Sequence, residues 1–178
     1  MDWDAISAIG DIVGALGVIA SLVYLSIQIR RSDETARAQS LQSVLDGHRD
    51  RSILPGYTDA NFTELLSKGL TDLQLLTVNQ QRQFYNYITE TVLQMQQVMQ
   101  LHERGLLGKV DYDAWMTHTT AIIGTPGGTV IWRYMESTIT PTIRELINTH
   151  IADNPGAPSF IEIIPLYRYE VDDAAANT

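Results

Sequence analysis

Cysteine is absent from this 178-residue chain. The absence excludes disulfide bridges, thiol nucleophiles and thiolate metal sites. Basic residues are also few. Of 12 Lys and Arg and 21 Asp and Glu, two arginines and three aspartates lie in the first 31 residues, which leaves 10 basic against 18 acidic residues and a net charge of −8 beyond them. That charge argues against nucleic acid as a partner and against binding of anionic lipid through a polybasic segment.

Charge of either sign is missing from one long stretch. Between Asp11 and Arg30 lie 18 residues, 12–29, whose polar side chains are Ser21, Tyr24, Ser26 and Gln28. As a helix this stretch would measure about 27 Å, close to the roughly 30 Å hydrocarbon thickness of a bilayer. We therefore predict a membrane-spanning helix. A fully buried central helix would need more apolar partners than the rest of the sequence offers, and a signal peptide would need a positively charged start.

The flanks of the predicted span indicate its orientation. No Lys or Arg precedes it, whereas Arg30 and Arg31 follow it directly. Short flanking segments rich in Lys and Arg stay on the cytoplasmic side, so we expect the N-terminus outside and the main domain in the cytoplasm. Trp3 and the two arginines are the expected anchors at the two membrane interfaces.

Small residues line one side of the predicted span. Gly10, Gly14, Gly17 and Ser21 are spaced four, three and four residues apart, so they share a helix face on which another backbone can approach closely. The alternative is that glycines are simply common in membrane helices. If the face is used, the anchor pairs with an integral membrane partner or with a second copy of the chain.

The rest of the chain has an all-α pattern, of about five helices in a compact domain. We divide the chain into an anchor at 1–31, a helical domain at 32–154, and an extended arm with an acidic tail at 155–178. Caps and breakers predict a first helix that continues to near Pro55, then helices at 58–69, 77–104, from Asp111, at 126–138 and at 141–152.

The C-terminal segment looks different because it contains three prolines and a β-like alternation of Tyr167 and Tyr169 with charged residues. A lone strand has no sheet to join in a helical protein. We expect an extended arm that lies over its own domain or binds a partner through Phe160, Ile161, Ile163, Ile164, Tyr167 and Tyr169.

Three kinds of chemistry are candidates. A metal could be held by His102, Glu103, Asp111, Asp113 and His118, but their spacing matches no known metal motif, so we predict capping and surface roles and no metal. Thr125 to Thr129 could hold an anion at a helix start, although close packing of its glycines against Trp115 or Trp132 is the favoured interpretation. No G-x-S-x-G or S-x-x-K pattern occurs, so no catalytic residue and no cofactor is predicted.

Four segments in order resemble an abundant, uncharacterised family of bacterial membrane proteins. They are WDAISAIGDIVGALGVIASLVYLSIQIR, NFTELLSKGLTDL, ERGLLGKVDYDAW and TPGGTVIWRYMESTITPTIREL. The most recognisable piece is the Trp115 helix followed by Pro126-Gly127-Gly128 and Trp132, although Ile131 stands where relatives often have an aromatic residue. The resemblance implies one N-terminal membrane helix, a helical domain and no particular reaction.

These observations favour a non-catalytic, single-span protein of the bacterial inner membrane. We expect an accessory or assembly subunit of a larger membrane complex. The alternative is a membrane-tethered sensor whose domain holds a small ligand between the long 77–104 helix and the Trp115 and Trp132 helices.

Overall fold

A computed structural model describes the backbone of residues 3–50 and 59–170, and the solvent exposure of residues 14, 16–50 and 59–170. The chain divides into two compact units, residues 1–41 and 42–178. The boundary that we predicted after residue 31 falls inside the first helix.

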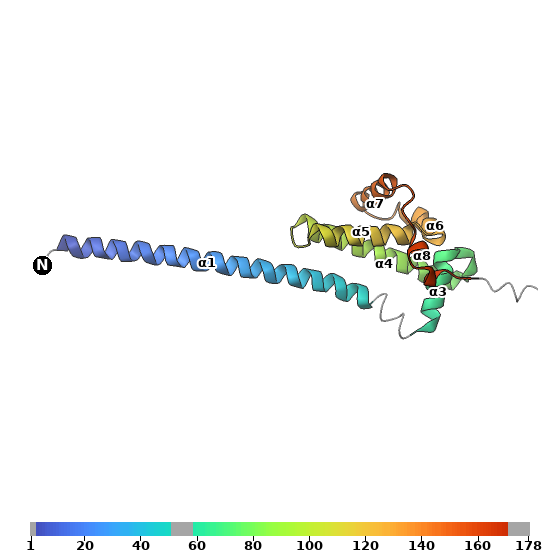
Figure 1. Ribbon diagram of the computed structural model, residues 1–178, viewed down its shortest axis with the longest axis horizontal. Helices are drawn as coiled ribbons and strands as arrows, with labels where there is room; N and C mark the ends of the chain where they lie inside the picture. The colour runs from blue at the N-terminus through green and yellow to red at the C-terminus, as the bar shows by residue number, and fades with distance from the viewer. Residues whose placement is uncertain (1–2, 51–58, 171–178) are drawn as a thin grey trace, which may run out of the picture. The chain divides into compact units, whose positions relative to one another are not determined.

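The first unit is formed by α1 (Trp3–His48), whose last residues belong to the second unit (Figure 1). Several polar side chains of α1 bond to their own helix. The Ser21 hydroxyl donates to the Gly17 carbonyl at 2.8 Å, and the Gln28 amide donates to the Tyr24 hydroxyl at 2.7 Å. These groups have partners in the helix itself and need none from outside it.

Over the part of the chain that the structure describes, no helix combines the length and the apolar character that crossing a membrane requires. The predicted span at 12–29 is thus not confirmed.

The second unit is built on a hairpin of α4 (Val78–Glu103) and α5 (Lys109–Ile123), which lie side by side in Figure 1. The capping box of Thr77 and Gln80 starts α4, as predicted. The prediction that Asp111 caps α5 is wrong, because extended Gly108 is the N-cap and the helix begins one residue later. The buried side of α4 repeats at intervals of three to four residues and includes Phe84, Ile88, Met95 and Val98.

Helix α3 (Ala60–Thr71) and the short 3-10 turn η2 (Leu73–Leu75) lead into the hairpin, and α6 (Pro126–Met135) follows it. We expected Gly69 to end α3, but it lies inside the helix and is buried. A Cβ on Gly127 of α6 would collide with the carbonyl of Gly69, and a Cβ on Gly69 would overlap the Phe84 ring. The two glycines therefore let α3 and α6 meet backbone to backbone beside Phe84.

The end of α1 completes the core of this unit. Val44 is fully buried, and the Gln94 amide donates to its carbonyl at 2.9 Å. Gln94 is a buried polar residue on α4. The interior is otherwise lined by large apolar side chains, including Leu70, Phe84, Ile122, Met135, Ile143 and Ile147.

Helix α7 (Pro141–Asp153) is followed by α8 (Phe160–Ile163) and the 3-10 turn η3 (Pro165–Tyr167). The prediction of an extended arm is wrong over 160–167. A capping box between Ser159 and Glu162 starts α8, and Pro165 opens η3. Local capping thus makes 160–163 helical, whereas residues 168–170, where the alternation continues, lie in no helix and no strand.

Candidate functional site

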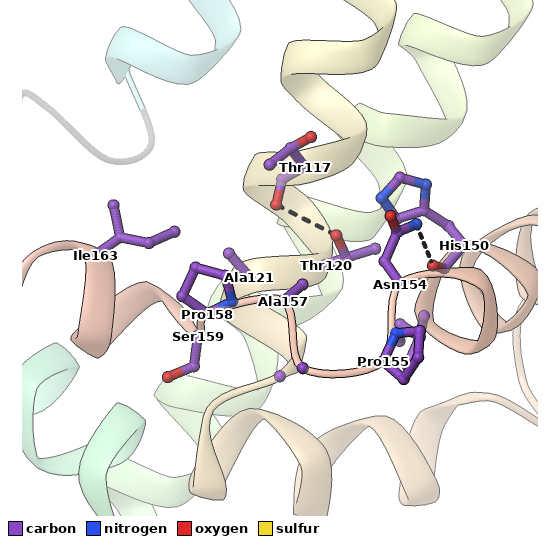
Figure 2. Close-up of a pocket in the computed structure, with 13 residues that line it drawn as sticks. Thr117, Thr120, Ala121, His150, Asn154, Pro155, Ala157, Pro158, Ser159 and Ile163 are labelled. Atoms are coloured by element: carbon purple, nitrogen blue, oxygen red, sulfur yellow. Dashed lines mark hydrogen bonds between the residues drawn. The ribbon is translucent and has the colours of Figure 1, made fainter.

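A pocket of about 200 Å³ lies between the C-terminal half of α5 and the connection from α7 to α8. We call it the α5–α7 pocket. Figure 2 shows Thr117, Thr120 and Ala121 on the α5 side, with His150 and Asn154 at the end of α7. The connection from Pro155 to Ser159, together with Ile151, Ile163 and Gly124, supplies the rest of the wall. Most of this wall is apolar.

The hydroxyl groups of the pocket have their hydrogens engaged elsewhere. Thr117 donates to the Asp113 carbonyl at 2.9 Å, and Thr120 donates to the Met116 carbonyl at 2.9 Å. The Asn154 amide donates to the carbonyl of His150 at 2.8 Å (Figure 2). Since a hydroxyl carries one hydrogen, the two threonines can offer a ligand only acceptor lone pairs.

The pocket also lies at the negative ends of two helix dipoles. Thr120 and Ala121 belong to the last turn of α5, and His150 and Ile151 to the last turn of α7, so two helix C-termini border the pocket. On the adjoining side, the Glu162 carboxylate accepts from the Ser159 N–H and hydroxyl. These hydrogen bonds lower the pKa of Glu162 below the ordinary value of a glutamate.

A second feature is a cluster of aromatic rings from three segments of the second unit. His48 lies edge-on to Trp115 at 5.1 Å and to His118 at 5.5 Å between ring centroids. His118 also contacts Phe160 at 5.6 Å, and Phe160 contacts Tyr167 at 5.4 Å. The cluster thus joins the end of α1, α5 and the C-terminal arm.

His118 is the most perturbed group of this cluster. Burial, and secondarily the positive charge that His48 can carry, lowers the pKa of His118 from 6.5 to about 4. His118 is therefore neutral at physiological pH. A shallow hollow of about 220 Å³ lies over His48, Ala114, Trp115 and His118. His48 itself is half-buried among these rings.

The predicted sites on α1 are only partly described. The solvent exposure of Trp3 and Gly10 lies outside what the structure describes. Gly14, Gly17 and Ser21 are exposed, and a Cβ on either glycine would meet nothing within 4 Å. Arg30 and Arg31 are exposed as well.

The C-terminal arm, which we expected to lie over its own domain or to bind a partner, contacts its own domain at several points. Ile161 is buried, Phe160 packs on His118, and the Tyr169 N–H donates to the Thr71 hydroxyl at 2.9 Å. Tyr169 also lies under the Lys68 ammonium, 5.0 Å from the ring centroid. Ile164 and Tyr167 are half-buried, which leaves Ile163 the most exposed of the predicted set.

The candidate metal and anion sites do not assemble. Among the described residues, no group of three or more His, Asp or Glu side chains could hold a metal ion. His102 instead stacks on Tyr112 and pairs with the Leu107 carbonyl at 3.0 Å. At the start of α6, Gly127 and Gly128 are buried by close packing, as favoured, but against Gly69 and the carbonyls at the end of α5 and not against Trp115 or Trp132.

Sequence reasoning missed the α5–α7 pocket. Its residues carry no motif, and the threonines of α5 look like ordinary helix positions. The one local signal is the run Asn154 to Pro158, since two prolines and a glycine after α7 force the chain to turn away from the helix axis.

Comparisons of the chain with family models, with curated proteins and with solved structures find no match. The resemblance to a bacterial membrane family thus stays an expectation from sequence.

Proposed function

We propose that this protein is a non-catalytic accessory subunit of a bacterial inner-membrane complex. In this proposal α1 is the membrane anchor and its small-residue face contacts a partner helix. The second unit is a cytoplasmic binding domain.

The observation that carries the proposal is the exposure of large apolar side chains on every side of α1. Leu22, Val23, Tyr24 and Leu25 are 51–64 % exposed, and four successive residues at 100° each surround a helix. Leu16, Val18, Ile19, Ile27 and Ile29 are exposed to a similar degree. A contiguous apolar surface of this kind is unfavourable in water and favourable in lipid or against other apolar helices.

The polar groups of this stretch support a lipid environment. Ser21 bonds to Gly17 and Gln28 bonds to Tyr24, and such internal pairing lowers the cost of placing polar groups in hydrocarbon. The exposed Arg30 gives the span a cytoplasmic edge.

The absence of cysteine makes a direct test possible. We would introduce single cysteines, Ser7→Cys before the span and Ser137→Cys in the exposed loop after α6, and label intact cells with a membrane-impermeant maleimide. The expected result is labelling of the first variant in intact cells and of the second only after lysis. Labelling of Ser137→Cys in intact cells, or release of the protein by alkaline carbonate, would overturn the proposal.

The subunit role has its own test. Gly17→Ile adds bulk to the small-residue face, whereas Ser26→Ile adds bulk on the opposite face of the helix, two and a half turns further along. In mild detergent we expect the native protein and Ser26→Ile to migrate as a large assembly, and Gly17→Ile as a smaller one. Migration of all three as monomers would contradict an accessory role.

A second candidate function is favoured by the α5–α7 pocket, which could make the second unit a small-ligand sensor. This pocket is not the site that the sequence suggested. The region between α4, α5 and α6 is filled by core side chains such as Phe84, Ile122 and Met135, each 0 % exposed. Titration of the full-length protein with small amphiphiles, followed by chemical-shift changes at Ala121 and Ile163, would test the sensor role.

A further inference from the structure

We infer that the α5–α7 pocket selects a small organic ammonium ion, with an aromatic ring or short alkyl chain on the apolar wall and the charged group at the ends of α5 and α7. The inference rests on the second candidate function, since it names the ligand class of that pocket.

The size of the pocket limits the apolar part of the ligand. An apolar cavity of about 150 Å³ is enough to hold a benzene molecule. The α5–α7 pocket, at about 200 Å³, therefore fits one ring with a short side chain. Ala121, Ile151, Ala157, Pro158 and Ile163 provide the apolar contacts.

Hydrogen bonding favours a ligand that donates. The hydroxyl hydrogens of Thr117 and Thr120 are engaged by backbone carbonyls of α5, so neither hydroxyl has a hydrogen left to donate to a ligand. Asn154 uses one amide hydrogen on the His150 carbonyl and retains its own carbonyl oxygen as a further acceptor. An ammonium group has three hydrogens to satisfy such acceptors, and a carboxylate has none.

Charge favours the same ligand. The last turns of α5 and α7 border the pocket, and the C-terminal end of a helix attracts cations. The ionised Glu162 adjoins the wall at Ser159, and the whole chain carries a net charge of −9. His150 is the basic side chain in the wall, and Arg168 lies near Glu162 beyond it. Two helix ends together are expected to favour an ammonium over a neutral group of the same shape roughly tenfold.

Three probes that share a phenylethyl group and differ in the polar end group separate these contributions: 2-phenylethylammonium, 2-phenylethanol and 3-phenylpropionate. Each is titrated into the full-length protein in non-ionic detergent, with chemical shifts at Ala121 and Ile163 as the readout. We expect the ammonium to bind about tenfold more tightly than the alcohol, and the carboxylate to bind weakest. Added salt should reduce the difference.

A charge change in the pocket wall should affect the ammonium and the carboxylate in opposite directions, whereas misfolding would weaken the binding of both. Asn154→Asp places a full negative charge at the exposed end of α7, so it should tighten the ammonium and weaken the carboxylate. Asn79→Asp, the same change at the start of α4, lies outside the pocket and should alter neither.

The outcomes separate this inference from the proposals beneath it. Equal binding of all three probes would overturn the ammonium inference and leave the sensor role standing. Tighter binding of the carboxylate would overturn the inference as well. If a folded protein binds none of the probes at millimolar concentration, the inference and the sensor role both fail, while the membrane labelling experiment decides the subunit role separately.

Discussion

Protonation of His118 should destabilise the second unit as the pH falls below 6.5. The ring is held neutral by burial and by His48, with a pKa of about 4 against 6.5 for an unperturbed histidine. Because the folded pKa is the lower one, the unfolded chain binds more protons between pH 6.5 and 4, and stability is lost as the pH falls through this window. At 1.36 kcal/mol for each pKa unit, the loss is about 2 kcal/mol at pH 5 and about 3 kcal/mol at pH 4.

The matched variant is His118→Phe, which keeps an aromatic ring beside His48 and Phe160 but cannot be protonated. Urea unfolding of the full-length protein, followed by circular dichroism at several pH values from 7.5 to 4, gives the free energy of unfolding. We expect the native protein to lose about 2 to 3 kcal/mol more than His118→Phe across this range. His150→Gln, a control elsewhere in the unit, should keep the native pH dependence.

Equal losses in the native protein and in His118→Phe would refute the assignment of the acid sensitivity to His118. A loss that starts only below pH 4 would also refute it, because a depressed histidine exerts its effect between its unfolded and folded pKa values.

Three further predictions concern packing and capping, each measured as the free energy of unfolding in urea at pH 7.5. Gly127→Ala should lower the free energy of unfolding by about 1–3 kcal/mol, because the added Cβ meets the Gly69 carbonyl. A neutral result would show that α3 and α6 are not in backbone contact. Gln94→Leu should cost about 1 kcal/mol by removing the hydrogen bond that the Gln94 amide donates to the Val44 carbonyl, and a stabilised variant would contradict that contact. Thr77→Ala should cost about 1 kcal/mol through loss of the capping box of α4, and no change would mean that the cap is not formed in solution.

Helix starts could be predicted from sequence because capping is local. Asp59, Thr77, Thr125 and Thr140 are the N-caps of helices that we expected to begin within two residues of these positions, and proline follows the last two caps directly. The exception is α5, where Gly108 takes the place of Asp111. Gly and Asp differ little in their preference for the N-cap position, so this preference does not distinguish Gly108 from Asp111.

The buried side of α4 can also be recognised from the sequence, because apolar residues repeat every three to four positions whatever they pack against. The sequence does not show which helices this side packs against. Gly69 has the sequence signature of a helix end, yet it is the position at which α6 approaches α3. The same residue type serves both purposes, and only the neighbouring helix distinguishes them.

Sequence by itself determined the all-α class, most helix boundaries, and the uncharged stretch that motivates a membrane anchor, because each depends on residues close together in the chain. Tertiary structure decided the rest. It folded the C-terminal arm onto α3 and α5, placed His48 beside His118, and formed the α5–α7 pocket from segments about 30 residues apart. Such contacts depend on how complete helices pack, and no local pattern of residues encodes that.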